Sequence, residues 1–307
     1  MGKIINDVKN DVVFTPDIVA NLMCRLCEID NNSIVIDNAA GSGALLKSAI
    51  KSKAKQIIGI EYNEYLFDTL VSNFDNGLFF NQDGLVDNKE IDYEKINVCL
   101  SNPPYSFKNK GLEFSHYIMQ KMKSGKCCVL IQESAGNGQG KEIAKEILKN
   151  NTLLASIKMS NIFCGSANVQ TIILLFNVGV PHKEENIVRF IDMTNDGFKR
   201  TSRKGSEPKD IDKAIERYNE VVELVLKGKD FLNLYNQDEY IEDKITLDGN
   251  DWTFNQHIKI DTIPTIDDFR NTVDKYMGWK AKMEFQKIFG DKDPYLVAMY
   301  LLKQGKE

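Results

Sequence analysis

Short runs of β-branched and other apolar residues alternate, in the first half of the chain, with segments whose apolar residues recur every three or four positions. The short runs predict buried strands, and the periodic segments predict amphipathic helices. The predicted strands are residues 33–37, 56–61, 77–84, 96–101 and 126–132, and the predicted helices begin near Thr15 and span 65–73 and 112–123. Such alternation is typical of an α/β fold with a parallel sheet.

Two later apolar runs, residues 153–159 and 169–177, follow each other without a convincing helical pattern between them. They predict a hairpin that adds an antiparallel edge to the sheet. The fold expected from the sequence is therefore a doubly wound, mostly parallel, seven-stranded Rossmann-like sheet with this edge hairpin.

The pattern changes near residue 200, where a basic loop containing Gly and Ser is followed by longer helical periods. Helical patterns cover about residues 211–227, 267–288 and 294–302. They predict a small, mainly helical C-terminal extension. We therefore expect one α/β domain over residues 1–200 and an extension over residues 201–307.

The composition is that of a globular protein, since 42% of the 307 residues are hydrophobic and 27% are charged. No stretch approaches the roughly 20 continuous apolar residues of a membrane-spanning helix. The 6 cysteines follow no secretory leader and form no regular framework, which favours a reducing cytoplasm. Cys24 and Cys27 form a C-x-x-C pair, but zinc requires further ligands and the chain has only 3 histidines. We therefore expect no metal.

The formal net charge of -5 does not favour a chain that binds nucleic acid over a wide surface. Non-specific affinity for nucleic acid comes from neutralised phosphates, so any such contact must be local or shared with another chain. One polar loop carries a basic cluster that consists of Lys199, Arg200, Arg203 and Lys204. These four residues are the candidate contacts to phosphates.

Four successive predicted strands end in polar residues. They end in Asp37 with a glycine loop, Glu61, Asp83, and Asn102 with its prolines. One acid at a strand end is often only a helix cap. Because ligands bind at the carboxyl ends of parallel strands, the serial order of the four predicts one shared crevice.

The glycine loop, Gly41-Ser42-Gly43, indicates the kind of ligand. A dinucleotide fingerprint requires glycine where Leu46 stands, and no G-K-[ST] follows at the distance of a phosphate-binding loop. A nucleoside ligand without phosphates is therefore preferred, and S-adenosylmethionine is such a ligand.

The strand-end acids suit the parts of that ligand. Glu61 is placed to accept hydrogen bonds from both ribose hydroxyls, and Asp83 to accept one from the exocyclic amine of the cofactor's adenine. Asp37 is expected to anchor the loop or, through water, the methionine ammonium. The glycines allow the backbone to approach the ligand closely.

The tetrapeptide Asn102-Pro103-Pro104-Tyr105 suits methyl transfer to a planar amino group. The lone pair of such a nitrogen is delocalised into the ring, which makes it a poor nucleophile. An amide oxygen from Asn102 and the Pro103 carbonyl, accepting the two N–H hydrogens, localise the lone pair toward the methyl donor. The prolines fix the backbone, and Tyr105 offers a flat face for an extruded base.

The order of the motifs resembles that of the adenine-specific N6 DNA methyltransferases, especially the modification subunits of type I restriction-modification systems. The motifs are F-T-P (14–16), D-x-x-x-G-S-G (37–43), Glu61, Asp83-Gly84 and N-P-P-Y (102–105), in the gamma order of those enzymes. Residues 161–165 and 170–176 are similar to the family's segment that supplies an aromatic residue against the flipped base. The match covers about residues 11–200.

This resemblance extends the candidate site. Thr15 and Pro16 are implied to border the cofactor, and Phe163 to provide a second stacking surface for adenine. The residues expected at the cofactor are Phe14, Thr15, Pro16, Asp37, Ala39, Gly41, Ser42, Gly43, Glu61, Tyr62, Asp83, Gly84, Asn102 and Pro104.

The resemblance implies that S-adenosylmethionine methylates the exocyclic amine of an adenine flipped out of double-stranded DNA. Asn38 departs from the family, which commonly has proline at this position. A further N-terminal helical domain and a large target-recognition domain are not evident. We therefore expect a separate DNA-specificity subunit, docked on the helices after Asp251, in a homo- or hetero-oligomer that serves restriction-modification.

Three other functions remain open at this stage. Methyltransferases of a protein glutamine amide use the same N-P-P-Y for the same hydrogen-bonding reason, and an RNA base is a further substrate. The F-T-P element and the segment from Phe163 to Phe176 favour DNA. A catalytically silent interaction module is the alternative from another class, but such a module need not retain both Asn102 and the cofactor acids.

Overall fold

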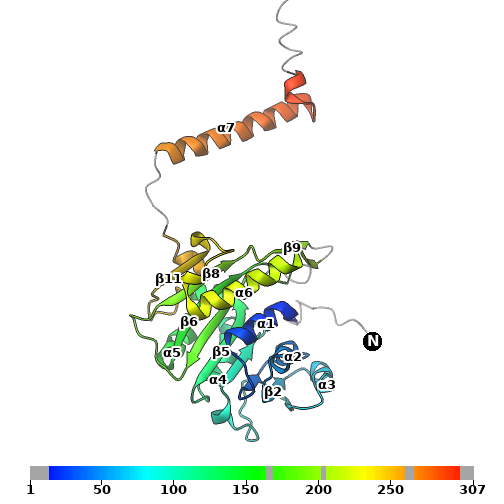
Figure 1. The fold of residues 1–307 in the computed structure, drawn as a ribbon, viewed down its shortest axis with the longest axis vertical. Helices are drawn as coiled ribbons and strands as arrows, with labels where there is room; N and C mark the ends of the chain where they lie inside the picture. The colour runs from blue at the N-terminus through cyan, green and yellow to red at the C-terminus, as the bar shows by residue number, and fades with distance from the viewer. Residues whose placement is uncertain (1–13, 164–168, 202–204, 260–265, 298–307) are drawn as a thin grey trace, which may run out of the picture. The chain divides into compact units, whose positions relative to one another are not determined.

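The structure is a computed structural model of the chain and describes residues 14–163, 169–201, 205–259 and 266–297. The chain divides into two compact units, Met1–Ile258 and Lys259–Glu307 (Figure 1). The first unit thus extends well beyond the boundary expected near residue 200. Elements after that position pack on the sheet and belong to its core.

Five parallel strands form one half of the sheet of the first unit. They are β1 (Ile34–Asp37), β2 (Gln56–Glu61), β3 (Leu78–Asn81), β4 (Val98–Ser101) and β5 (Gly125–Gln132). Their spatial order is β5-β4-β1-β2-β3, with parallel pairing throughout. This confirms the predicted parallel α/β sheet, and it makes β1 and β4 the neighbours at which the strand order reverses.

The other half of the sheet contains both strands of the predicted hairpin. β6 (Asn151–Met159) and β7 (Thr171–Val178) pair antiparallel, and β7 also pairs antiparallel with β5. The hairpin does not form the edge, because β8 (Val188–Met193) pairs parallel with β6 and β11 (Tyr240–Asp243) pairs antiparallel with β8. The sheet therefore has nine strands rather than the expected seven.

The two additional strands were difficult to recognise in the sequence. β8 is interrupted by two charged residues, Arg189 and Asp192, and β11 is a four-residue strand with two acids. They acquire strand structure by pairing with a sheet that already exists. A separate hairpin follows β8 and consists of β9 (Phe198–Thr201) and β10 (Gly205–Pro208).

Helices cover both faces of the sheet. One face packs against α1 (Asp17–Leu26), α2 (Ala44–Lys51), α3 (Glu64–Ser72) and α6 (Ile211–Lys227). The opposite face packs against α4 (Leu112–Met119) and α5 (Lys141–Asn150). Figure 1 shows α6 and α1 lying across the first of these faces. Because strand side chains alternate, β5 contributes Cys128 and Leu130 to the first core and its other apolar residues to the second.

The sequence missed α5 and the role of the aromatic stretch near residue 252. Trp252 and Phe254 are completely or almost completely buried, and the Trp252 ring lies 5.6 Å from the ring of Phe176, measured between centroids. The Trp252 N–H of the backbone donates to the Gly136 carbonyl. This stretch therefore belongs to the second core and is not part of a free docking surface.

The C-x-x-C pair lies inside the first core. Cys24 and Cys27 are both buried, and burial raises the pKa of the Cys24 thiol to about 12. Such a thiol stays protonated and is a poor metal ligand. Within the described ranges, no group of three or more metal-binding side chains comes together.

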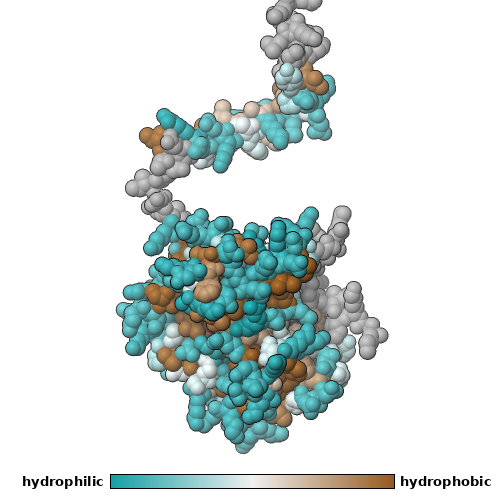
Figure 2. Space-filling model, viewed as in Figure 1, coloured by the Kyte–Doolittle hydropathy of each residue, from teal (hydrophilic) through white to brown (hydrophobic). Residues whose placement is uncertain are grey.

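The second unit consists mainly of α7 (Ile266–Phe289), close to the helix predicted from the sequence. Residues 294–297 are also helical, whereas residues 298–302 of that prediction lie outside the described residues. Apolar side chains are exposed along α7 between charged ones (Figure 2). Throughout the described part of the chain, every helix is too short or too polar to cross a membrane.

Candidate active site

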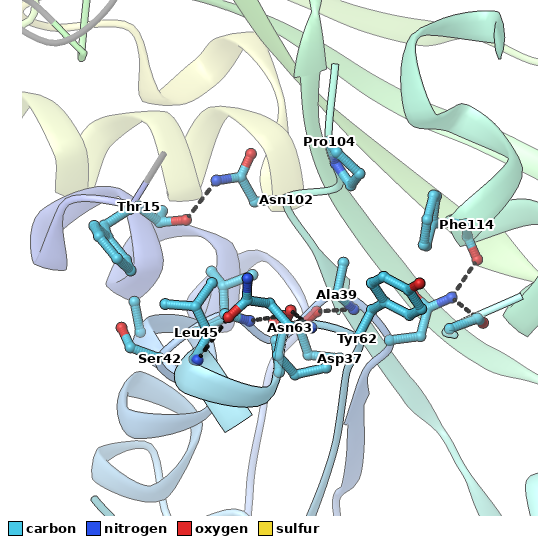
Figure 3. Close-up of a pocket in the computed structure, with 18 of the residues that line it drawn as sticks. Thr15, Asp37, Ala39, Ser42, Leu45, Tyr62, Asn63, Asn102, Pro104 and Phe114 are labelled. Carbon is cyan, nitrogen blue, oxygen red and sulfur yellow. Dashed lines mark hydrogen bonds between the residues drawn. The ribbon is translucent and has the colours of Figure 1, made fainter. Parts of the chain in front are cut away.

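A cavity of about 520 Å³ opens at the carboxyl ends of β4, β1, β2 and β3 (Figure 3). Every residue expected at the cofactor lines this cavity except Pro16 and Gly43. The remaining lining residues, which the sequence did not predict at the cofactor, are Asn38, Ala40, Ala44, Leu45, Asn63, Leu66, Phe107 and Phe114. The four polar strand ends thus meet in one crevice at the reversal of the strand order.

The glycine loop joins β1 to α2, and its two glycines do different things. Gly41 lines the cavity in a left-handed conformation (φ 55°), and a Cβ placed on it would meet nothing within 4 Å. Gly43 begins α2 with φ 90°, and a Cβ there would lie 2.4 Å from the ring of Phe74. Gly41 therefore leaves room for a ligand, whereas Gly43 allows α2 to pack against the end of α3.

Two carboxylates, those of Asp37 and Glu61, accept hydrogen bonds from the backbone of the loop. Asp37 is 1% exposed, and its Oδ1 accepts a hydrogen bond from the Ala39 N–H at 3.1 Å. Burial raises the pKa of Asp37 to about 7, with the Ala39 N–H opposing the rise and nearby Glu61 adding to it. Glu61 accepts from the Gly41 N–H at 2.7 Å and from the Asn63 N–H at 2.8 Å, one bond to each oxygen. Burial raises the pKa of Glu61 as well.

These groups fit the ribose and base of a nucleoside. Each Glu61 oxygen holds one backbone donor and retains a lone pair that suits a ribose hydroxyl. The Tyr62 ring, 79% exposed, lines the same cavity as Phe114, against which Phe107 packs edge to face at 5.2 Å. Asp83 follows β3, and its Oδ1 accepts from the Leu85 N–H. An acid and aromatic rings beside each other suit the amine and faces of adenine.

The Asn102 side chain is held from both sides. Its Nδ2 donates to Thr15 Oγ1 at 3.1 Å (Figure 3). Its Oδ1 accepts from the Tyr105 hydroxyl at 2.8 Å. Thr15, which precedes α1, is 6% exposed. Both partners are hydroxyl groups, and together they hold the amide between the segment before α1 and the residue three positions after Asn102. The sequence placed Thr15 beside the cofactor but could not show that it orients a side chain 87 positions away.

The two expected stacking residues lie together but away from the cavity surface. Tyr105 is 9% exposed and Phe163 is 2% exposed, with ring centroids 6.4 Å apart and planes at 55°. Stacking of a base on either ring remains a prediction, because it requires a ring face to become accessible. Pro104 lines the cavity, whereas Pro103 is buried. Gly111 (φ 83°) packs so closely that a Cβ there would lie 2.8 Å from the Pro104 carbonyl.

The predicted basic cluster belongs to the β9–β10 hairpin. Lys199 is exposed in β9, whereas Arg203 and Lys204 lie outside the described residues, as does the side chain of Arg200. The hairpin begins beside Asp196, a carboxylate with 0% exposure.

Asp196 connects three parts of the first unit. It accepts from the Ser160 hydroxyl at 2.9 Å, the Tyr218 hydroxyl at 3.0 Å and the Phe198 N–H at 3.1 Å. Ser160 immediately precedes the segment that carries Phe163, and Tyr218 is on α6. The base of the hairpin is thereby tied to that segment, a connection that no sequence pattern indicated.

A mostly parallel sheet with a strand-end acid, a glycine loop and a cavity at the reversal of strand order is the arrangement typical of class I S-adenosylmethionine-dependent methyltransferases. A solved protein described as a putative class I S-adenosylmethionine-dependent methyltransferase, from Listeria monocytogenes, has a similar fold, with a TM-score of 0.52 and 18% identity over 70% of this chain and 72% of that chain. The model of the N-6 DNA Methylase family matches residues 6–285. The chain therefore belongs to the N-6 DNA methylase family, and S-adenosylmethionine is its methyl donor.

Comparison with individual proteins agrees with this family. The chain is 27% identical, over 310 aligned positions, to the type II restriction enzyme and methyltransferase RM.BcgI of Heyndrickxia coagulans. The alignment covers 89% of this chain but 46% of that protein, so the chain spans about half the length of this curated relative.

Solved modification subunits share the fold. The type I restriction-modification methyltransferase subunit of Streptococcus thermophilus gives a TM-score of 0.63 at 16% identity, over 80% of this chain and 59% of that subunit. The modification subunit of a putative type I restriction enzyme from Vibrio vulnificus YJ016 gives a TM-score of 0.57 at 17% identity, over 75% of this chain and 55% of that subunit. At these identities the likeness describes the fold alone.

Proposed function

We propose that the chain methylates the exocyclic amine of an adenine flipped out of double-stranded DNA, as the modification subunit of a restriction-modification system. The observation that carries this proposal is the placement of the Asn102 amide in the lining of the cavity. Thr15 and Tyr105 hold this amide, with Nδ2 toward Thr15 Oγ1 and Oδ1 toward the Tyr105 hydroxyl. A methyltransferase for planar amines requires an acceptor at this position.

The chemistry follows from two carbonyl oxygens. A carbonyl oxygen has two lone pairs, so Asn102 Oδ1 accepts one amine hydrogen while it keeps its bond from the Tyr105 hydroxyl. The Pro103 carbonyl accepts the other hydrogen. The nitrogen lone pair is thereby directed out of the ring plane and forms a bond to the methyl carbon as the carbon–sulfur bond breaks. The amine then loses one proton to solvent. S-adenosylmethionine supplies the methyl group as part of a sulfonium.

Different residues around the cavity bind different parts of the cofactor. Glu61 holds the ribose, Asp83 the adenine amine, and Tyr62 with Phe114 the faces of the adenine. Phe14, Thr15 and the Gly41 backbone border the methionine part. The open space beside Gly41 and the position of these side chains in the cavity lining support this assignment.

Recognition of DNA is shared with another chain. The β9–β10 hairpin, with Lys199, Arg200, Arg203 and Lys204, contacts phosphates, and a separate specificity subunit selects the sequence. The described part of α7 supports a subunit partner, since Ile266, Phe269, Val273, Tyr276 and Met283 follow heptad spacing and are all exposed. The docking region assigned to residues after Asp251 is therefore narrowed to the second unit.

The test is transfer of tritiated methyl from S-adenosylmethionine to unmethylated DNA, followed by nucleoside analysis. The chain is assayed alone and together with the product of the neighbouring gene. We expect labelled N6-methyladenine, with Asn102→Ala reducing turnover by at least about a hundredfold, in line with the loss of a transition-state hydrogen bond. S-adenosylhomocysteine should bind both proteins with similar affinity.

Two results would contradict the proposal. If DNA stayed unlabelled while a glutamine-containing peptide or RNA, supplied in parallel assays, became labelled, the substrate would be that peptide or RNA and not DNA. Full activity of Asn102→Ala would remove the amide from the mechanism.

A further inference from the structure

The polar side chain of Asn38 is buried at the wall of the cavity. It directly follows β1 and Asp37, it is 1% exposed, and it lines the cavity. Its Nδ2 donates to the Gly84 carbonyl and to the Phe114 carbonyl, both at 3.0 Å. One amide therefore joins three segments that are distant in the sequence.

The joined segments all border the same part of the cavity. Gly84 follows Asp83 in the loop after β3, and Phe114 belongs to the first turn of α4. In Figure 3 the hydrogen bond to the Phe114 carbonyl lies beside Tyr62 and Ala39. Asp83 and the rings of Tyr62 and Phe114 border this part of the cavity. Thr15 and Asn102 lie on the other side of the cavity (Figure 3).

The backbone reinforces the connection. A Cβ placed on Gly84 would lie 1.9 Å from the Asn38 carbonyl oxygen and 3.3 Å from the Phe114 ring. Only glycine allows this approach. Both the backbone and the side chain of Asn38 thus set the spacing between the loop that carries Asp83 and the helix that carries Phe114.

We propose that Asn38 is a positioning residue for the adenine half of the cofactor site, which it shapes by holding Gly84 and Phe114 at a fixed separation. This inference rests on the proposed function, because it assigns this half of the cavity to adenine.

The test uses binding, so that it does not depend on turnover. S-adenosylhomocysteine and 5′-methylthioadenosine both contain adenosine, but only the former contains the amino-acid part. Their affinities are measured by calorimetry for wild type, Asn38→Asp and Asn38→Ala. Asn38→Asp keeps the shape and removes both donors, and Asn38→Ala avoids introducing a buried charge that could prevent folding.

The matched control is Asn151, at the start of β6 in the other half of the sheet. It is 2% exposed, donates to the Ile147 carbonyl at 2.9 Å and accepts from the Gly179 N–H at 3.2 Å. Asn151→Ala also removes two backbone contacts of a buried amide. It should lower the melting temperature without changing the affinity for either compound.

We expect both Asn38 variants to bind both compounds about tenfold more weakly, by the same factor, as loss of hydrogen bonds from a buried amide implies. Unchanged affinities would overturn the proposal. Weaker binding of S-adenosylhomocysteine alone would also overturn it, because the effect would then lie in the amino-acid half. If wild type bound neither compound, the proposed function itself would fail.

Discussion

At the residue scale, the site depends on polar side chains whose ionisation or orientation is set by a few neighbours. Asp37 shows this most clearly. It is buried under the glycine loop with one backbone donor, and burial raises its pKa from 3.8 to about 7. A single N–H does not compensate for the loss of water around a carboxylate. The ionised form of Asp37, which suits the cofactor, therefore lowers the folding stability of the protein without cofactor.

This cost gives a prediction about pH. Because the folded pKa of Asp37 lies above its unfolded value, its contribution to stability is present below about pH 4 and is lost as pH rises through about 7. Asp37→Asn removes this dependence and keeps the acceptor for Ala39. We expect the variant to gain in melting temperature relative to wild type as pH rises from about 5 to 8.

Asp30→Asn serves as the control, because the Asn32 and Ser33 donors lower the pKa of that exposed carboxylate. The difference in melting temperature between Asp30→Asn and wild type should be nearly constant over the same pH range, since the unfolded carboxylate is already ionised there. A pH-independent difference for Asp37→Asn would show that Asp37 is not held at a raised pKa.

At the element scale, α1 and β4 have to be placed correctly for Asn102 to face the cavity in the right orientation. Thr15 stands two positions before α1, and Asn102 directly follows β4. α1 packs against α2 and α6 in the first core, which holds Thr15 beside Asn102. The hydrogen bond between them is thus a consequence of helix packing.

Replacing Thr15 by Val tests this connection, because valine keeps the shape and removes the acceptor for Asn102 Nδ2. We expect kcat to fall about tenfold, the cost of about one hydrogen bond at the amide. Thr15→Ser retains the hydroxyl and should restore most of the rate. Single-turnover methyl transfer measures both, while S-adenosylhomocysteine binding reports on the cavity. Equal loss in the Ser and Val variants would assign the effect to packing of the methyl group.

At the scale of the whole molecule, the first unit carries a complete cavity and the second presents an apolar stripe. Among the described residues of α7, Phe269 and Tyr276 are 68% and 55% exposed. Exposed aromatic residues at heptad spacing are typical of a helix that packs on another helix. The proposed function accordingly places methyl transfer in the first unit and assembly in the second, which stays a prediction.

This assignment is testable with charge substitutions. Phe269→Asp together with Tyr276→Asp should weaken binding to the specificity subunit by at least about tenfold, as expected for removal of buried aromatic anchors. Lys275→Asp together with Lys282→Asp alters the opposite face and should change binding little. Analytical ultracentrifugation of the mixed subunits measures both. Binding of S-adenosylhomocysteine should be the same in all variants, and normal assembly of the first variant would exclude the stripe as the docking surface.

The sequence by itself determined most of the parallel half of the sheet and the position of the cavity. Each of β1 to β5 is a contiguous apolar run, and the acids, glycines and Asn102 follow these strands directly. These residues could be found from the sequence alone, because residues that directly follow parallel strands all lie at the carboxyl ends of the strands, on the same side of the sheet. The family motifs could therefore be recognised before any contact was known.

Only the tertiary structure decided what holds these residues in place. The bonds of Asn102 to Thr15, of Asn38 to Gly84 and Phe114, and of Asp196 to Ser160 and Tyr218 join segments far apart in the sequence. β8, β11 and the stretch around Trp252 were equally hidden, because their stability comes from the sheet on which they pack and not from their own pattern. Local periodicity specifies strands and helices, but packing alone determines which distant polar groups meet.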